Sequence, residues 1–356
     1  MQNRIMGDSP LATFLRIVEI TLFCLGFISQ FYFLVRMRKV SLLHFNLKVL
    51  LGSFSMAYVI VAVTRLLNYV EDWISTAPLS SNLTVTQAQR CFVRRLFYDT
   101  AINVISFAMI CFAFERLFAT IYSHNYERKG QRSTGVLLGV LVWLVSFAGS
   151  LIMFVENWIS YDFWHTPIPY NTCDILLTFP KALQIIAVCA VISYALTALI
   201  FIAVHIYNRR VSKQIYKTEA AHSLSLRYQH AENISTTRFL SVIVATFGVD
   251  LFCSCFTLFY VTLNEGSSDI VVVVLSVAYN IVDAAYCFLF PLMCILLHRP
   301  LKDQLKADVR TLMCWEKFRN MGKRPDVQIR SVTGRNLPNA YNSSRDYFDA
   351  LQKMWN

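Results

Sequence analysis

The stretch VLLGVLVWLVSFAGSLIMF, residues 136–154, contains no charged residue. A helix of about 20 residues crosses the hydrocarbon core of a bilayer, which is about 30 Å thick. Six other stretches are similarly apolar and reach or nearly reach that length: Phe14–Val35, Phe45–Val63, Leu96–Ile121, Ala182–Ile206, Phe239–Leu263 and Ile270–Leu297. Because a backbone in lipid must satisfy its own hydrogen bonds, each stretch is expected to be helical. The sequence therefore predicts an all-α fold, a bundle of seven transmembrane helices.

The composition agrees with a membrane protein. Of the 356 residues, 56% are hydrophobic and only 15% are charged, which argues against a soluble enzyme. Soluble chains of this length are expected to form about two domains, whereas here one bundle and a tail account for the length. We expect a transmembrane domain at residues 1–299, a short helix at 300–315 and a disordered cytosolic tail at 316–356.

The distribution of basic residues predicts the orientation. The loops at 36–41, 122–135 and 207–238 and the segment after residue 297 together carry 24 Lys and Arg, and the opposite side carries 6. The positive-inside rule then places the N-terminus outside the cell and the tail in the cytosol of a multi-pass plasma-membrane protein. The net charge of +11 thus reflects topology and contacts with membrane lipids, and a nucleic-acid partner is not expected.

The segment after the seventh helix is amphipathic. Pro300 begins it, and apolar and basic residues then alternate with helical spacing: Leu301, Leu305, Val309, Leu312 and Met313 against Lys302, Lys306 and Arg310. This pattern predicts a helix on the cytosolic membrane face over residues 300–315. Cys314 at its end is a candidate palmitoylation site.

Cysteines and sequons can be sorted by the predicted topology. Seven of the ten cysteines lie within helices, where we expect them to act as small hydrophobic residues. Only Cys91 and Cys173 face the oxidising side, so they are expected to form a disulfide, the alternative being two free thiols. Of three sequons, only the one at Asn82 lies outside the cell and is expected to be glycosylated; those at Asn233 and Asn342 lie inside.

Glu115 and Arg116, at the cytosolic end of the third helix, are the strongest functional candidates. An adjacent acid and base there is tolerated if Arg116 reaches the interface or finds partners. One interpretation is an interfacial anchor. The other is a conformational switch, in which Glu115 or the sixth helix holds Arg116 until the cytosolic end opens.

Polar residues within the helices are candidates for ligand contact: Asp99, Asn103, Asp250, Asp283 and Tyr286. For Asp99, a local salt bridge to Arg94 or Arg95 is a serious alternative. The others form a structural polar network equally well. The seven histidines are scattered, and no paired-ligand or nucleophile motif occurs, so we expect no metal site, no cofactor and no enzymatic activity.

Two motifs resemble a known family. The first is Phe114-Glu115-Arg116 with Ala119-Thr120 and Tyr126-Glu127, and the second is Leu224-Ser225-Leu226-Arg227-Tyr228-Gln229 leading to Glu232-Asn233. They resemble nematode serpentine chemoreceptors of the superfamily of classes alpha, alpha-beta, beta and epsilon, and class epsilon is favoured. Glu115-Arg116 matches the family's motif in the third helix, and Cys91 with Cys173 matches its outer bridge.

The resemblance implies a G-protein-coupled receptor in the cilia of sensory neurons that senses odorant or pheromone-like molecules and activates a heterotrimeric G protein. The chain departs from rhodopsin-like receptors, because the sixth helix lacks a proline near Phe252 and the seventh has Phe290-Pro291. Two alternatives from other classes remain, a ligand-gated cation channel of inverted topology and a small-solute transporter. The absence of a filter-like segment and of a sequence repeat weakens both.

Overall fold

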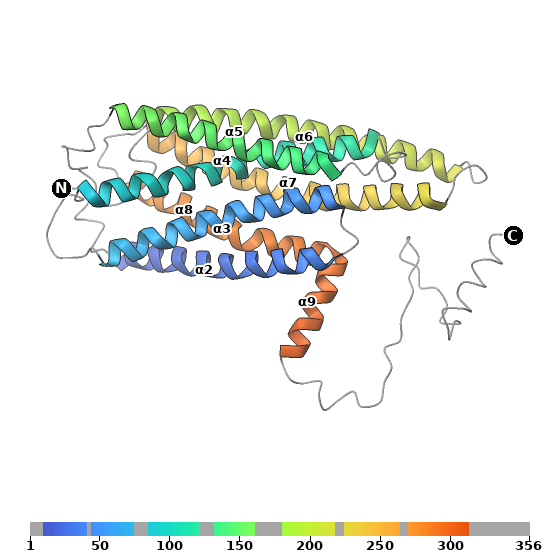
Figure 1. Cartoon of the computed structure of the whole chain (residues 1–356), viewed down its shortest axis with the longest axis horizontal. Helices are drawn as coiled ribbons and strands as arrows, with labels where there is room; N and C mark the ends of the chain where they lie inside the picture. Colours follow the sequence, from blue (N-terminus) through green and yellow to red (C-terminus); the bar gives the residue numbers. More distant parts are fainter. Residues whose placement is uncertain are drawn as a thin grey trace. The chain divides into compact units, whose positions relative to one another are not determined.

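The computed structural model describes residues 10–40, 44–74, 85–121, 132–160, 180–217, 224–263 and 270–312. Its regular elements in these ranges are all α-helices (Figure 1): α2 Pro10–Lys39, α3 Phe45–Ile74, α4 Val85–Ile121, α5 Arg132–Ser160, α6 Pro180–Lys217, α7 Leu224–Leu263, α8 Ile270–Leu297 and α9 Arg299–Leu312. The seven helices α2 to α8 are long and apolar enough to cross a membrane. The predicted all-α, seven-helix architecture with a short following helix is confirmed.

Several helices extend beyond the apolar stretches from which the sequence predicts them. α4 begins at Val85, α6 continues to Lys217, and α7 begins at Leu224, well before the apolar residues from Phe239 onward. Hydropathy detects only the part of a helix at the depth of the hydrocarbon core, whereas backbone hydrogen bonding continues into polar sequence. The segment 207–238, expected as a loop, is therefore helical over most of its length.

The membrane-length helices form a closed bundle around α4. α4 packs against α3, α5, α6 and α7, and α8 closes the bundle by packing against both α7 and α2. The ribbons of α2 to α8 in Figure 1 lie nearly along one direction. A displacement of α4 would therefore change its packing against four neighbouring helices.

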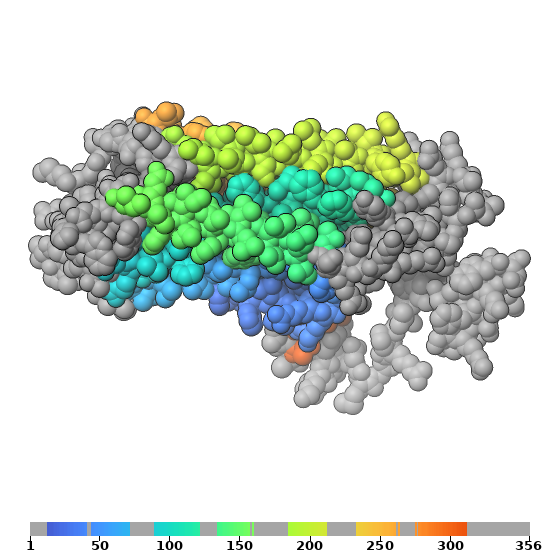
Figure 2. Space-filling model, turned by 45° about the horizontal axis from the view of Figure 1, so that its top comes forward, coloured from blue at the N-terminus to red at the C-terminus, as the bar shows by residue number. Residues whose placement is uncertain are grey.

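The outer faces of the bundle are apolar. Figure 2 shows α5 and α6 at the surface, and their outward side chains include Leu144, Val145, Ile152, Ile185 and Leu199. A continuous apolar surface of this size is not tolerated in water and marks contact with lipid. The exposed apolar residues are thus the membrane-facing side of the helices.

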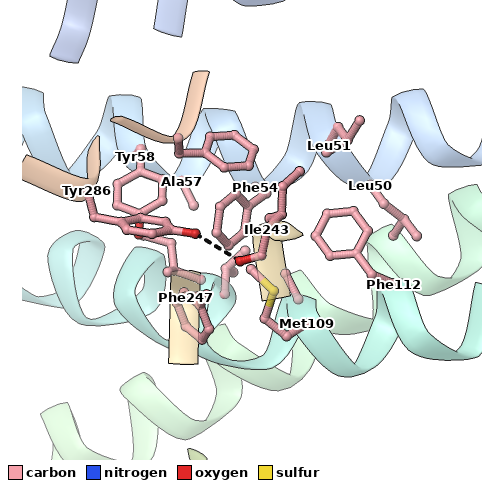
Figure 3. Close-up of a cluster of buried hydrophobic side chains, with 14 of the residues drawn as sticks. Leu50, Leu51, Phe54, Ala57, Tyr58, Met109, Phe112, Ile243, Phe247 and Tyr286 are labelled. Carbon is pink, nitrogen blue, oxygen red and sulfur yellow. Dashed lines mark hydrogen bonds between the residues drawn. The ribbon is translucent and has the colours of Figure 1, made fainter. Parts of the chain in front are cut away.

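An aromatic cluster fills the middle of the bundle (Figure 3). The ring of Phe54 in α3 is fully buried and lies 4.5 Å from that of Phe290 in α8, 6.0 Å from that of Phe112 in α4 and 6.2 Å from that of Phe247 in α7. Edge-to-face contacts at these separations are favourable beyond the burial of area. Phe54 therefore joins four helices at one point.

Pro291 interrupts the backbone hydrogen bonding of α8. Proline has no N–H, so the carbonyl of Cys287, four residues earlier, loses its helical partner. The buried side chain of Gln30 in α2 fills this vacancy, since its Nε2 donates to the Cys287 carbonyl at 2.8 Å. Ser55 in α3 in turn donates to Gln30 Oε1. A proline in α8 is thus accommodated by a glutamine from another helix.

Replacing Gln30 with leucine should lower stability, because the Cys287 carbonyl is left buried without a partner. The expected loss is about 1–3 kcal/mol, the cost of an unsatisfied buried acceptor. Thermal unfolding of the purified receptor measures it. In a Pro291→Ala background the helix regains its own N–H donor, so Gln30→Leu should cost clearly less there. An equal loss in both backgrounds would contradict this account.

α9 begins directly after α8 and matches the amphipathic helix expected at 300–315. The chain divides into two compact units, residues 1–305 and residues 306–356, and the domain bounds expected from the sequence stay a prediction. In the first unit, Leu301 is buried and Leu305 packs against the hydrophobic core. The position of α9 on a membrane surface stays a prediction. Cys314 and the tail at 316–356 lie outside the described residues.

Candidate functional site

Glu115 and Arg116 form a buried ion pair near the end of α4. Their exposed fractions are 0% and 1%. Arg116 donates from Nε to Glu115 Oε2 and from Nη2 to Glu115 Oε1, both at 2.5 Å. The pairing is bidentate, the strongest arrangement of guanidinium and carboxylate. Because both groups are removed from water, an anchor that reaches the lipid headgroups does not describe Arg116 in this conformation.

Arg116 also links α4 to α7. Its Nη1 donates to Asn233 Oδ1 at 3.3 Å, and Asn233 Nδ2 donates to Thr120 Oγ1 at 3.1 Å. Asn233 therefore contacts two residues of α4, one turn apart. We call Glu115, Arg116, Thr120 and Asn233 the Arg116 latch. The sequence suggested Glu115 or the sixth helix as the partner of Arg116, and the structure has both.

The sequence does not single out Asn233 as a candidate site residue. It shows this residue only as a sequon and as part of a family motif. In the structure its side chain is buried, and both ends of its amide are hydrogen-bonded. The available signal was helical spacing, because Asn233 lies four residues before Thr237, which is also buried, and thus on the same face of α7.

His298 lies between α8 and α9, where α7 also approaches. Its ring meets that of Phe239 of α7 edge-on at 6.0 Å. Partial burial lowers the pKa of His298 below its ordinary value, because the charged form loses hydration. A lower pKa favours the neutral imidazole, which is compatible with packing on an aromatic ring. This contact joins α7 to the C-terminal end of α8.

Ion pairs concentrate at the opposite end of the bundle. Arg65 Nη2 in α3 lies 2.6 Å from Glu19 Oε1 in α2, and Glu19 is 1% exposed. Glu71 pairs with both Arg94 and Arg90 of α4. These pairs connect α2 to α3 and α3 to α4, and they explain how the predicted outer half of the bundle tolerates buried charge.

Asp99 has the local partner considered from the sequence. Its Oδ2 lies 3.5 Å from Arg95 Nε, one turn earlier in α4. Its Oδ1 is buried and accepts no hydrogen bond from the described residues. The local salt bridge is therefore present, and one carboxylate oxygen is still available.

Asp250 of α7 and Asp283 of α8 lie within electrostatic range of each other. The charge of Arg65 acts on the buried Asp283 carboxylate. Asp250 Oδ1 and Asp283 Oδ2 are buried and have no hydrogen-bond partner among the described residues. Buried oxygens of this kind are the natural acceptors for a polar group of a ligand or for water.

The remaining two candidate ligand residues are engaged in helix packing. Asn103 Nδ2 donates to Ser150 Oγ at 2.9 Å, which turns this side chain toward α5. Tyr286 donates to the backbone carbonyl of Ile243 at 3.3 Å (Figure 3). The structure therefore places Asp250 and Asp283 within electrostatic range of each other, whereas it turns the Asn103 amide toward α5.

Other expected sites fall partly or wholly outside the described residues. Cys91 lies in α4, but Cys173 and Asn82 are not described, so the disulfide and the glycan stay predictions. Seven described cysteines within helices are free thiols. Within the described ranges, no group of three His, Cys, Asp or Glu side chains is arranged to hold a metal ion.

Comparison with known proteins identifies the family. The model of the serpentine type 7TM GPCR receptor class ab chemoreceptors matches residues 2–313. The chain is 22% identical to serpentine receptor class alpha/beta-14 of Caenorhabditis elegans, over 96% of this chain and 88% of that protein. It is also 22% identical to a probable G-protein coupled receptor of the same nematode, over 64% of this chain and 59% of that protein.

The expected superfamily is confirmed, whereas the expected class is not. Class epsilon is unsupported, because the match is to class ab along almost the whole bundle. The two motifs used in the sequence comparison cover only short segments, which is too little to separate classes of one superfamily. The chain belongs to the class ab family of serpentine seven-transmembrane chemoreceptors, and it is therefore a multi-pass membrane receptor rather than an enzyme.

Proposed function

We propose that this receptor binds a small odorant or pheromone-like molecule from outside the cell and activates a heterotrimeric G protein inside it. The observation that carries the proposal is the Arg116 latch, a fully buried polar link between α4 and α7 at the end that the positive-inside rule assigns to the cytosol. Burying a guanidinium costs desolvation free energy, and separating it from its partners on two helices also costs free energy. It therefore suits a two-state device better than a passive anchor.

In this mechanism the latched conformation is the resting state. Opening the cytosolic end separates Asn233 from Arg116 and exposes both α4 and α7 to the G protein. A ligand shifts this equilibrium only by the difference between its affinities for the two conformations. Ligand contact with α7 or α8 at the outer half is the simplest way to obtain such a difference, because α7 also carries Asn233.

Asp99, Asp250 and Asp283 are the proposed ligand contacts. Each has a buried carboxylate oxygen that accepts no hydrogen bond from the described residues. Asn103 and Tyr286, the other two candidates, are better explained by their bonds to Ser150 and Ile243. A screen of volatile and pheromone-like compounds on cells with a G-protein reporter tests the proposal. Asp250→Asn and Asp283→Asn should then change the potency of an active compound.

The orientation of the chain is part of the proposal. The N-terminus, the Asn82 glycan and the Cys91–Cys173 disulfide are placed outside a plasma membrane, and a palmitoylated Cys314 inside. Glycan mapping decides between this receptor and a channel of inverted topology. Modification at Asn82 supports the receptor, whereas modification at Asn233 or Asn342 supports the channel.

Replacing Asn233 with alanine should raise ligand-independent signalling. The change removes a hydrogen bond to a charged group, which typically contributes about 1.5 kcal/mol or more, so the ratio of open to latched receptor should rise by about tenfold. Basal G-protein activation at matched surface levels measures the effect. Ser235→Ala is the control, because Ser235 is exposed on the same helix and should leave basal activity unchanged. Equal basal activity in Asn233→Ala and the parent would contradict the latch.

A further inference from the structure

Two carboxylates lie at the same level of α7 and α8. The ring of Phe247 in α7 lies 5.9 Å from that of Tyr286 in α8 (Figure 3). Asp250 follows Phe247 by one helical turn, and Asp283 precedes Tyr286 by one helical turn. Because α7 and α8 are consecutive spans and run in opposite directions, both acids lie one turn beyond this ring contact on its outer side. They are also within electrostatic range of each other.

Four buried side-chain oxygens at this level have no hydrogen-bond partner among the described residues. Two of them are Asp250 Oδ1 and Asp283 Oδ2. Ser254 Oγ lies one turn further out on α7, and Asn280 Oδ1 lies one turn further out on α8. The side chain of Asn280 is buried with an exposed fraction of 4%, and that of Asp283 with 7%. Since buried polar atoms are nearly always hydrogen-bonded, this group of oxygens indicates a binding site. We call these four residues the acceptor cluster.

The chemistry of the acceptor cluster selects the kind of group that it binds. Carboxylate oxygens and the amide oxygen of asparagine only accept hydrogen bonds, and a serine hydroxyl can accept as well. A group that satisfies all four oxygens must therefore donate. An ammonium group carries donors and no acceptor, and its hydrogen bonds to carboxylates are about twice as strong as those between neutral groups.

The charge at the acceptor cluster also favours a cation. Among the described residues, neither Asp250 nor Asp283 takes part in an ion pair. The charge of Arg65 acts on Asp283, but Arg65 donates from both Nε and Nη2 to Glu19. Each of the two acids lies 13 residues from the outer end of its helix, about 20 Å along the axis. A carboxylate at that depth costs free energy unless a positive group accompanies it.

Aromatic rings distinguish an organic cation from a metal ion. Tyr279 of α8 and Tyr58 of α3 lie within electrostatic range of both carboxylates, and the ring of Tyr58 lies 5.9 Å from that of Tyr286 (Figure 3). Aromatic faces attract ammonium groups within about 6 Å of the ring centre. In the described ranges no three His, Cys, Asp or Glu side chains are arranged to hold a metal ion. An ion such as Ca²⁺ takes about six to eight oxygens, which is more than the acceptor cluster supplies.

We propose that the acceptor cluster binds the protonated nitrogen of an amine, so that the ligand of this receptor is a small organic ammonium ion. This inference rests on the proposed function and names the chemical class of its ligand. The nitrogen lies between Asp250 and Asp283 and donates to both carboxylates. Ser254 and Asn280 accept from it on the outer side, and the apolar part of the amine packs against the tyrosine rings.

Thermal unfolding of the purified, full-length receptor in lipid nanodiscs tests the ammonium site. The probes are ethylammonium chloride and 2-phenylethylammonium chloride, each titrated at constant ionic strength against sodium chloride. Ethanol and 2-phenylethanol are the matched neutral probes, because they keep the shape and a donor but lose the charge. The variants are Asp250→Asn and Asp283→Asn, which remove one negative charge each with little change in volume.

The parent receptor should be stabilised by the ammonium probes alone. Its unfolding midpoint should rise saturably by about 3 °C once a probe reaches about ten times its dissociation constant. Sodium chloride and the two alcohols should shift the midpoint by less than about 1 °C. Each Asn variant loses a hydrogen bond between charged groups and should bind the probes at least about tenfold more weakly.

Glu71→Gln is the matched control. It makes the same change from carboxylate to amide at a residue that pairs with Arg90 and Arg94, and it should keep the full ammonium-induced shift. No saturable shift with either ammonium probe, an equal shift with sodium or the alcohols, or unchanged affinity in both Asn variants overturns the proposal. The first of these results is the one expected if both carboxyl groups carry protons and bind only water.

The failure of this proposal can be told from the failure of the proposed function, because unfolding measurements need no G protein. If the carboxylate-dependent shift occurs as described and no amine activates a G protein, the ammonium site stands and the coupling proposal fails. If the reporter screen yields active acids or neutral compounds and the ammonium probes do not bind, the receptor function stands and the ammonium site fails.

Discussion

Arg116→Ala is expected to abolish ligand-evoked G-protein activation and to reduce the amount of folded receptor. The substitution leaves Glu115 fully buried without its bidentate partner. Breaking a buried pair by removing one member typically costs about 3–5 kcal/mol. Thermal unfolding of the purified receptor and surface labelling measure the loss of stability, and a G-protein reporter measures the loss of signalling.

Loss of signalling must be separated from loss of folding. The double variant Glu115→Gln with Arg116→Ala removes the buried charge together with its partner, and should recover much of the stability. If the latch is a switch, this variant should reach the surface and still fail to respond to ligand normally. Arg116→Ala with normal surface levels and an unchanged ligand response would remove the switch from the mechanism.

Arg65→Ala is expected to have a comparably large effect on stability, at the other end of the bundle. Glu19 is 1% exposed and pairs with Arg65 at 2.6 Å. The guanidinium of Arg65 also lies over the ring of Tyr69, 5.6 Å from its centroid. Removing Arg65 leaves the Glu19 carboxylate buried and unpaired, which should lower the free energy of unfolding by about 3–5 kcal/mol.

The pairing of Glu19 with Arg65 can be isolated by a double-mutant cycle. Glu19→Gln in the Arg65→Ala background should recover part of the lost stability, because a neutral amide costs less to bury than a carboxylate. Arg90→Ala provides the control, since Arg90 pairs with Glu71 but its side chain is 60% exposed. An exposed pair contributes about 1 kcal/mol or less. Equal losses for Arg65→Ala and Arg90→Ala would show that burial does not set the importance of these pairs.

Two features of the fold place these pairs where they matter. α4 packs against four other helices, so the latch and the pairs of Glu71 with Arg90 and Arg94 of α4 act on the centre of the bundle. The aromatic cluster around Phe54 lies between them and joins α3, α4, α7 and α8. A close-packed region of this kind transmits a displacement rather than absorbing it.

The sequence by itself determined the number and type of helices, because a bilayer leaves an apolar segment of about 20 residues no other way to satisfy its backbone. It also identified Glu115 and Arg116, since charged residues are rare enough at membrane depth to stand out. The salt bridge between Asp99 and Arg95 could also be predicted from the sequence, because the two residues lie one turn apart on the same helix.

Only the tertiary structure decided which helices these residues join. The bond between Asn233 and Arg116 and the bond between Gln30 and the carbonyl left by Pro291 both depend on contacts between helices. Hydropathy alone cannot supply such contacts, because the lipid-facing and helix-facing sides of a transmembrane helix are both apolar. The rotation of each helix about its axis is fixed by packing and interhelical hydrogen bonds, and these exist only once the bundle has assembled.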